Sequence, residues 1–474
     1  MFRLTSALGL GSALVATVLS AGCPNREVAA VDPNQQKEEK KLIPVGSNRN
    51  IDILFVIDNS GSMGEEQASL ATNFPVFMSV LNNIMGGLPN VHIGVVSSNT
   101  GVGGYNIGGC GGDGDNGVLQ ATARGSCTPP TGKFIVDIQP DDPLQPRIQN
   151  YPAGKLEDTF TCIAKLGTTG CGFEQHLESM KRALENNKPN ENKDFLRKDA
   201  YLAIIIIADE DDCSAGNSAV FDPNDTALTG TLGPLASFRC TEFGITCNEG
   251  NLGRTAASYT GCKPRTDSYI RNPQDYVNFV KGLKDDPNLI IVSGIIGNPE
   301  PVRVKLNGMN QPELDHSCMD PAGVNGAADP AVRLKFFLDA FPGSTSTSIC
   351  NNDLSAALQK IAEALARVIG NPCLEGDIAK DDINPNATGI QIECSVEDVR
   401  YPGTEQESSK AIRRCDMQDA TTPKMAQAHP CWYVKADVTC VPPNSPSGLQ
   451  LLVERDMGAD PPTGTYVQAS CVSN

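Results

Sequence analysis

Three separated segments of this chain carry hydroxyl and carboxylate oxygens at spacings that could bind one metal ion. Asp58, Ser60 and Ser62 alternate along the first segment, Thr169 lies in the second, and Asp209 opens the third. Such oxygens are ligands for a hard cation, Mg²⁺ first and Mn²⁺ or Ca²⁺ as alternatives. Few carboxylates would leave the ion under-neutralised and ready to take an incoming carboxylate. This is the chemistry of binding, since hydrolysis would also need a positioned base or nucleophile.

Each segment also has a structural interpretation. Asp58 and the two serines could cap the helix that follows a strand-to-helix turn, and Thr169 could cap a later helix. Its neighbour Thr168 is the second choice for the threonine ligand. The acidic run of residues 209–212 is more readily a solvated loop than a second metal site, although it could bind Ca²⁺. A site that no longer binds metal, in a fold held by disulfides, is a third possibility.

The three segments lie between alternating strand and helix patterns, which predict the sheet that positions them. Apolar runs predict buried strands, and amphipathic runs between them predict helices. The expected strands are residues 51–57, 91–96, 133–138, 202–207 and 289–296, and the expected helices are residues 65–85, 174–185, 273–284, 332–341 and 353–369. The alternation predicts an α/β fold with a doubly wound, mostly parallel sheet. Ligands bind at the carboxyl ends of such strands, where Asp58 and Asp209 both lie.

The first segment resembles a known motif. An apolar strand followed by Asp58-Asn59-Ser60-Gly61-Ser62-Met63 is similar to the metal-ion-dependent adhesion site of von Willebrand factor A domains, and the resemblance covers about residues 49–370. It implies that Ser60 and Ser62 bind the metal directly and that Asp58 acts largely through water. Thr169 and Asp209 would complete the site. The resemblance also implies a protein ligand that presents an acidic residue to the metal.

The chain departs from that family pattern at two points. The family often has Asp-Gly after the fourth strand, where this chain has Asp209-Glu210, and the threonine loop here carries Cys171 and Gly172. Both departures concern how ligands exchange at the metal more than whether the metal binds.

The net charge and the motifs of the sequence exclude several classes of function. The formal net charge of -18 argues against nucleic acid as a partner, because phosphate binding needs a basic face. The four histidines form no HExxH motif, and the sequence has neither a Gly-x-Ser-x-Gly elbow nor a phosphate-binding glycine loop. We therefore expect a binding protein and no enzyme. The alternative is a metal-dependent hydrolase that uses the same site, with Glu210 or Asp211 as the base.

Cysteine content and the N-terminus indicate export. The chain has 17 cysteines without zinc-site spacing, which indicates an oxidising compartment and disulfides. Residues 1–22 have the pattern of a secretory signal peptide. Its end, Leu19-Ser20-Ala21-Gly22-Cys23, resembles a lipobox with Ser20 at the usually aliphatic position, so Cys23 is the expected lipidation site. Cleavage after Ala30, giving a secreted protein, is the alternative. Either outcome leaves 16 cysteines for disulfides.

These patterns divide the chain into four parts. A signal peptide (1–22) precedes a polar, disordered tether (23–48), a von Willebrand factor A-like domain (49–372) and a small cysteine-rich β-type module (373–474). Long insertions at residues 99–130 and 212–272 interrupt the domain, and their cysteines are expected to pin them. We expect a cell-envelope lipoprotein, lipid-anchored to the outer membrane or the cell surface.

Overall fold

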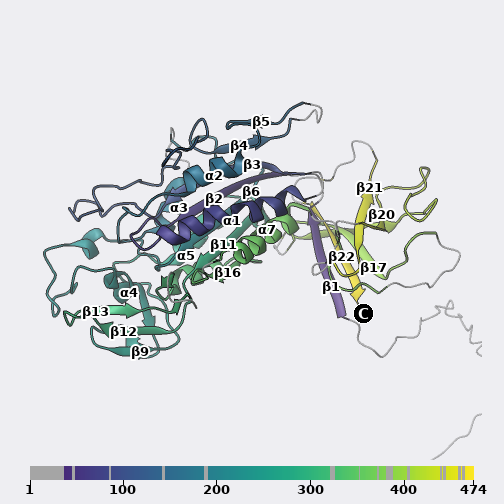
Figure 1. Ribbon diagram of the computed structural model, residues 1–474. Coiled ribbons are helices and arrows are strands. Elements are labelled where there is room, and N and C mark those ends of the chain that lie inside the picture. Colours follow the sequence, from purple (N-terminus) through teal and green to yellow (C-terminus); the bar gives the residue numbers. More distant parts are fainter. Residues whose placement is uncertain are drawn as a thin grey trace, which may run out of the picture.

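A mixed, mostly parallel sheet forms the centre of the molecule (Figure 1). The computed structural model describes residues 37–44, 49–84, 87–140, 145–185, 191–320, 326–351, 353–370, 373–379, 388–402, 406–437, 440, 445–456, 461 and 465–473. The sheet has the strand order β16-β11-β6-β2-β3-β4-β5. Its strands are β2 (Asn50–Ile57), β3 (Asn90–Ser97), β4 (Ile135–Ile138), β5 (Ile148–Gln149), β6 (Tyr201–Ala208), β11 (Ile290–Ile296) and β16 (Thr345–Ser348). Neighbours from β16 to β3 are parallel, and β4 and β5 pair antiparallel at one edge.

Helices cover both faces of this sheet. Helices α1 (Gly64–Asn82), α2 (Leu156–Ala164) and α7 (Ser355–Gly370) pack on one face. Helices α3 (His176–Leu184), α5 (Pro273–Lys281) and α6 (Val332–Asp339) pack on the other. Successive side chains of a strand point to opposite faces, so Phe55 of β2 joins the first core while Leu54 and Val56 join the second. The predicted doubly wound α/β class is confirmed.

Most expected elements are present, with ends shifted by a few residues. The strand expected at residues 133–138 is shorter and antiparallel, and the helix expected at residues 65–85 begins with Gly64 and ends at Asn82. The sequence patterns did not predict α2 or the edge strand β16. Neither carries a long periodic run that would stand out from its surroundings. Among the described residues, no helix has the length and apolar content needed to cross a bilayer.

Small sheets built from insertions lie at one end of the central sheet. They comprise β7 (Ile245–Cys247), β8 (Gly250–Asn251) and β10 (Lys263–Pro264), then β9 (Ala257–Tyr259), β12 (Val302–Leu306) and β13 (Pro312–Asp315), and finally β14 (Cys318–Met319) with β15 (Ala327–Ala328). Helix α4 (Phe238–Gly244) packs beside them. Figure 1 shows β9, β12 and β13 at the end opposite the C-terminal strands.

Eight disulfides join the 16 cysteines other than Cys23, which lies outside the described residues. The pairs are Cys110–Cys171, Cys127–Cys162, Cys213–Cys240, Cys247–Cys262, Cys318–Cys350, Cys373–Cys440, Cys394–Cys471 and Cys415–Cys431. The expected disulfides are thus present. Two of them tie the insertion at residues 99–130 to the segment around α2, and two more cross-link the insertion at residues 212–272.

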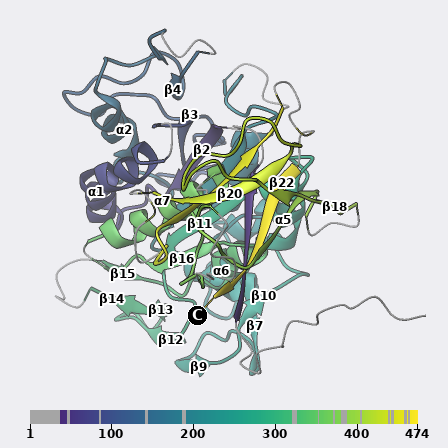
Figure 2. The ribbon, with the colours of Figure 1, turned by 90° about the vertical axis from the view of Figure 1, so that its right-hand side faces the viewer.

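The C-terminal residues form two sheets around a core of their own. One sheet has the order β1-β22-β17-β18 and the other the order β19-β20-β21. The strands are β1 (Lys37–Pro44), β17 (Cys394–Arg400), β18 (Ser408–Ala411), β19 (Arg413–Arg414), β20 (Cys431–Ala436), β21 (Leu449–Glu454) and β22 (Thr465–Ser473). Figure 2 looks at the molecule from this side and shows β20 and β22 in front of the central sheet.

Strand β1 corrects one expectation. Lys37–Pro44 lies within the segment expected to be a disordered tether, yet it pairs with β22 over its full length. The ammonium of Lys41 is buried and donates to the carbonyl of Cys373 and to Glu375, 3.3 Å away. A charged sequence without apolar period is typical of an edge strand as well as of disorder, and only the presence of β22 distinguishes the two. The remaining part of the expected tether, the signal peptide and Cys23 lie outside the described residues.

Candidate metal centre

The carboxyl ends of β2 and β6 bring the first and third predicted segments together. Asp58 follows β2 and donates its backbone N–H to Ile207, the next-to-last residue of β6, over 2.9 Å. Asp209 follows β6 directly. Because the two strands are parallel neighbours, both acids leave the same edge of the sheet, as the sequence predicts.

Asp58 is fully buried and holds its turn together. One carboxylate oxygen, Oδ1, accepts hydrogen bonds from the backbone N–H of Ser60 at 2.7 Å and from the hydroxyl of Ser98 at 3.3 Å. The other, Oδ2, lies 2.9 Å from Nε2 of His176. The Asp58 carbonyl accepts from the side chain of Gln67 in α1. This network suits a residue that shapes the site and supports a metal without supplying all of its charge.

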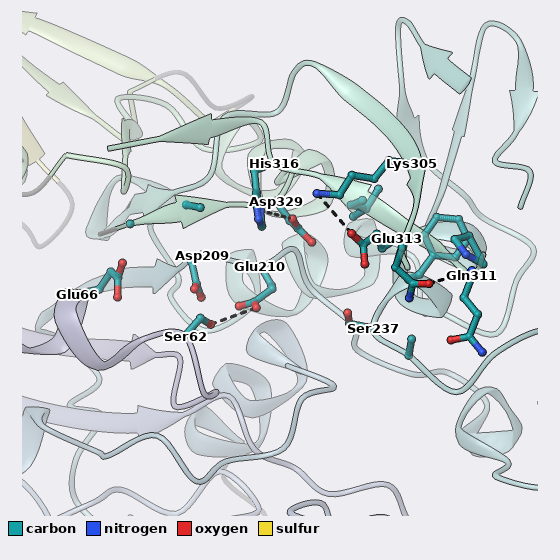
Figure 3. A pocket seen from close by; sticks show the side chains of 17 residues that line it. Ser62, Glu66, Asp209, Glu210, Ser237, Lys305, Gln311, Glu313, His316 and Asp329 are labelled. Atoms are coloured by element: carbon teal, nitrogen blue, oxygen red, sulfur yellow. Dashed lines mark hydrogen bonds and ion pairs between the residues drawn. The ribbon is translucent and has the colours of Figure 1, made fainter. Parts of the chain in front are cut away.

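The two serine hydroxyls point to one carboxylate. Oγ of Ser60 lies 3.1 Å from Oγ of Ser62. Glu210 accepts from both, with Oε1 3.3 Å from Ser62 and Oε2 3.5 Å from Ser60. Figure 3 shows the contact between Ser62 and Glu210, with Asp209 beside them. Glu210 therefore joins the site, although the sequence suggested it only as the base of the alternative hydrolase.

Asp209 gives the clearest indication that this edge of the sheet could hold a cation. It is 2% exposed, and its Oδ1 atom has no hydrogen-bond partner among the described residues. Ligand oxygens of Asp58, Asp209 and Glu210 all lie within 4.8 Å of one another. Burial raises the pKa of both Asp209 and Glu210, and the contact between the two carboxyl groups raises the pKa of Glu210 further. Buried polar atoms normally find partners, so an orphaned carboxylate oxygen among other acids fits a bound cation.

The donor set also fits the kind of metal that the sequence predicts. The gathered groups are carboxylates and hydroxyls, with no thiolate among them, and they match Mg²⁺, Mn²⁺ or Ca²⁺ better than a soft metal. Asp58, Asp209 and Glu210 would hold the ion, together with the hydroxyls of Ser60 and Ser62. The buried acids could hold a metal ion, and its binding and identity stay predictions.

The threonine loop docks against the same turn. Gly170 donates to the carbonyl of Asn59 at 2.8 Å, and a Cβ on Gly170 would lie 2.6 Å from that carbonyl oxygen, so only glycine fits. Gly167 exchanges hydrogen bonds with the side chain of Gln67. Thr168 approaches the start of α1, where its methyl group would lie 3.4 Å from a Cβ at Gly64. Thr169 is exposed, and its role as a ligand stays a prediction.

The acidic run after β6 divides between two tasks. Asp209 and Glu210 face the site, whereas the carboxylate of Asp211 accepts the backbone N–H groups of Arg333 and Leu334 at the start of α6. Asp212 is fully buried and pairs with the guanidinium of Arg333 at 2.9 Å. The expectation of a solvated loop was therefore wrong. These side chains cap helices in the interior, which sequence patterns do not distinguish from solvation.

Two buried residues near the site had no signal in the sequence analysis. His176, the first residue of α3, is fully buried against Asp58, and its Nδ1 has no hydrogen-bond partner among the described residues. Glu174 is also buried. Its burial, and then the charges of Asp58 and Asp209, raise the pKa of Glu174 well above its usual range. Lone His and Glu residues at a helix start are common, so only the fold reveals their position.

The edge of the sheet that carries Asp209 and Glu210 opens into a cavity of about 520 Å³. One wall carries Ser62, Asp209 and Glu210, and the insertion around β12 and β13 forms the opposite wall with Lys305 and Glu313 (Figure 3). Ligand pockets in proteins commonly enclose roughly 300–1,000 Å³. The site is therefore a walled pocket, large enough for a projecting side chain or a short peptide segment.

Comparison with known proteins gives distant structural likeness alone. No family model matches this sequence, and no curated protein matches it. Among solved structures, the chain is similar to a von Willebrand factor type A protein from Catenulispora acidiphila, with 13% identity and a TM-score of 0.28 over 93% of this chain and 66% of that one. It is also similar to the pilus adhesin of Streptococcus pneumoniae, with 10% identity and a TM-score of 0.29 over 92% of this chain and 58% of that one.

A third similar structure is proximal thread matrix protein 1 of the mussel byssus, with 9% identity and a TM-score of 0.23 over 69% of this chain and 48% of that one. The chain spans less than two thirds of the length of each of these three structures. At such scores the fold class rests on the strand order and the two helix layers described above.

Proposed function

We propose that this chain is an extracytoplasmic binding protein that captures an acidic side chain of a protein ligand through a divalent cation, Mg²⁺ in the first instance. The observation that carries the proposal is the buried Oδ1 of Asp209, which lies beside Asp58 and Glu210 and has no hydrogen-bond partner in the described part of the chain. A bound cation would supply positive charge and an open coordination position for the ligand carboxylate. The cavity gives that carboxylate room to reach the site.

The number of carboxylates around the proposed cation bears on how a ligand carboxylate could bind to it. Three carboxylates would over-neutralise a divalent cation, but Nε2 of His176 lies 2.9 Å from Oδ2 of Asp58, and a proton on His176 would offset the charge of that carboxylate. The half-buried Glu210 lines the cavity and contacts both serine hydroxyls. In this proposal Glu210 would give up its place at the cation to the incoming carboxylate of the partner, and the net charge of the site would be the same before and after binding.

We further propose that the protein is no enzyme. The hydrolase alternative needs a carboxylate base within the cavity. Asp211 is held by the backbone of α6, and Glu210 is the remaining candidate of the two. In our proposal Glu210 is a metal ligand that yields to the partner.

The cellular location of the protein is also a proposal. Eight disulfides support an oxidising, extracytoplasmic compartment. We propose a lipid anchor on Cys23 that holds the chain on the outer membrane or the cell surface. Mass spectrometry of the mature N-terminal peptide tests this, since a diacylglyceryl mass on Cys23 supports the anchor and an unmodified N-terminus after Ala30 contradicts it.

The function is tested in two steps with the full chain. Calorimetry with MgCl₂ and MnCl₂ should show one divalent site in the wild type and none in Asp58→Ala or Asp209→Asn, while the exposed control Asp285→Asn binds as the wild type does. Pull-down from the native envelope should then recover a partner that EDTA releases and that the two site variants fail to capture. A wild type that binds no divalent cation contradicts the proposal, and a turnover activity lost with Asp58→Ala supports the hydrolase.

A further inference from the structure

We infer that Glu66 forms a second recognition point in the cavity, so that the ligand carries a cationic side chain next to its metal-binding carboxylate. This deepens the proposed function and rests on it. The ligand class is a peptide segment in which an acidic residue has a lysine or arginine as a close neighbour.

Glu66 lies in the first turn of α1 and lines the cavity together with Ser62 and Asp209. The residue is 6% exposed, and its Oε2 atom has no hydrogen-bond partner among the described residues. Burial raises the pKa of Glu66 to about 7, with further increments from Asp209, Glu65 and Asp58. A buried carboxylate oxygen without a donor is costly, and a ligand cation would satisfy it.

The cavity itself offers Glu66 no cation. Of the described residues that line it, Lys305 and His316 are the cationic or titratable bases. The ammonium of Lys305 lies 3.4 Å from Glu313 and 3.6 Å from Asp315. Nδ1 of His316 lies 3.1 Å from Asp329. Figure 3 shows Lys305 with Glu313 on the side of the cavity opposite Glu66, and His316 beside Asp329.

The divalent cation would not satisfy Glu66 either. The oxygens that gather within 4.8 Å belong to Asp58, Asp209 and Glu210, and Glu66 is not part of that group. A cation bound there would offset the repulsion that Asp209 and Asp58 exert on Glu66, but the larger cause of its raised pKa is burial, and that cost would remain until a ligand cation reached the carboxylate. The occupied cavity would then present a metal for an anion and, along the same wall, a carboxylate for a cation. A volume of about 520 Å³ has room for both ligand groups.

The test uses three synthetic peptides with blocked ends and Gly–Ser flanks. One carries a single aspartate, one carries aspartate followed by lysine, and one carries aspartate followed by acetyl-lysine, which keeps the length and removes the charge. Calorimetry in MgCl₂ compares the wild type with Glu66→Gln. Glu65→Gln is the matched control, because Glu65 is an exposed acid in the same turn. MnCl₂ titrations report how many ions each variant binds.

We expect the lysine peptide to bind the wild type and Glu65→Gln roughly fivefold more tightly than the acetyl-lysine peptide, as for a single ion pair. Glu66→Gln should bind the two peptides equally and bind one Mn²⁺ as the wild type does. Equal binding of all peptides by the wild type, or a lysine preference that survives in Glu66→Gln, overturns the inference and leaves the proposed function intact. Two Mn²⁺ ions in the wild type and one in Glu66→Gln would show that Glu66 holds a second metal, which also overturns it. If no peptide binds in MgCl₂, the proposed function fails and the inference fails with it.

Discussion

His176 and Asp58 form a fully buried pair, with Nε2 of the imidazole 2.9 Å from Oδ2 of the carboxylate. Burial alone would lower the pKa of His176, but the hydrogen bond and the charge of Asp58 outweigh it and raise the pKa. His176 fixes the orientation of the Asp58 carboxylate through Oδ2, while Ser60 and Ser98 donate hydrogen bonds to Oδ1. In the proposed metal centre the histidine would act as a positioning residue.

We predict that His176→Gln weakens binding of Mn²⁺ by roughly 10- to 100-fold, the usual effect of removing a partner that orients a metal ligand. Calorimetry measures the affinity, and thermal unfolding in EDTA shows whether the chain still folds. The control is His92→Gln. His92 is buried at the opposite end of the sheet, where its Nδ1 lies 2.8 Å from the carbonyl of Phe195. Equal losses of Mn²⁺ affinity in both variants would indicate a general effect on folding.

We predict that metal-free protein loses stability as the pH rises, and that Mg²⁺ reduces the loss. Burial raises the pKa of Glu66 from 4.5 to about 7 and also raises the pKa of Asp209 and Glu210. A raised carboxyl pKa favours the folded state fully below the unfolded pKa, and this advantage disappears as the pH rises through the folded pKa. The melting temperature in EDTA should therefore fall between about pH 4.5 and pH 7, with other buried acids such as Asp52 contributing.

Mg²⁺ replaces the protons on the same carboxylates. The increase in melting temperature that MgCl₂ produces should be small near pH 5 and large near pH 7.5, because protons and metal compete for Asp209 and Glu210. Asp209→Asn should show no such increase at either pH. A Mg²⁺ effect of constant size across this range would contradict the assignment of these acids to the metal.

We predict that Arg333→Met destabilises the protein by about 3–5 kcal/mol, because it leaves Asp212 as an unpaired buried charge. Both side chains are fully buried, and the guanidinium also donates to the carbonyl of Arg271. Urea unfolding measures the loss in the free energy of unfolding. The matched control is Arg303→Met, since Arg303 is exposed and 3.6 Å from the exposed Asp315. A change below about 1 kcal/mol in Arg333→Met would contradict the role of the pair.

We predict that deletion of residues 1–44 destabilises the C-terminal sheet, whereas deletion of residues 1–36 does not. The longer deletion removes β1, exposes the edge of β22 and frees the carbonyl of Cys373 from Lys41. Limited proteolysis should then cut within residues 373–474 faster in the longer deletion alone. Affinity for Mn²⁺ should stay the same in both, because Asp58 and Asp209 lie at the other end of the central sheet. Equal proteolysis of the two deletions would show that β1 adds no stability.

Local sequence patterns predicted where several residues of the candidate site lie. Apolar runs marked β2 and β6, and the turns that follow them carry Asp58 and Asp209. Because parallel strands release their carboxyl ends at one edge, the nearness of these acids followed from strand type alone. Ser60 and Ser62 followed from their spacing after β2, since a strand-to-helix turn brings alternate residues to one side.

The sequence could not assign the partners of those residues. Glu210 faces the serines while its neighbour Asp211 caps α6, and nothing in the acidic run itself predicts this division. Likewise, Lys37–Pro44 carries the composition of a disordered segment and becomes a strand through β22, a strand more than 400 residues later in the sequence.

The sequence by itself determined the α/β class, the strand ends that bear the hydroxyls and acids, the even set of cysteines and the acidic charge, because each follows from side-chain type and periodicity over short stretches. The tertiary structure alone decided that His176 contacts Asp58, that Glu210 enters the site, and that β12 and β13 wall the cavity lined by Glu66, whose Oε2 has no hydrogen-bond partner among the residues that the structure describes. These relationships depend on how distant segments pack, and packing places a side chain next to residues that its own neighbours in the chain do not specify.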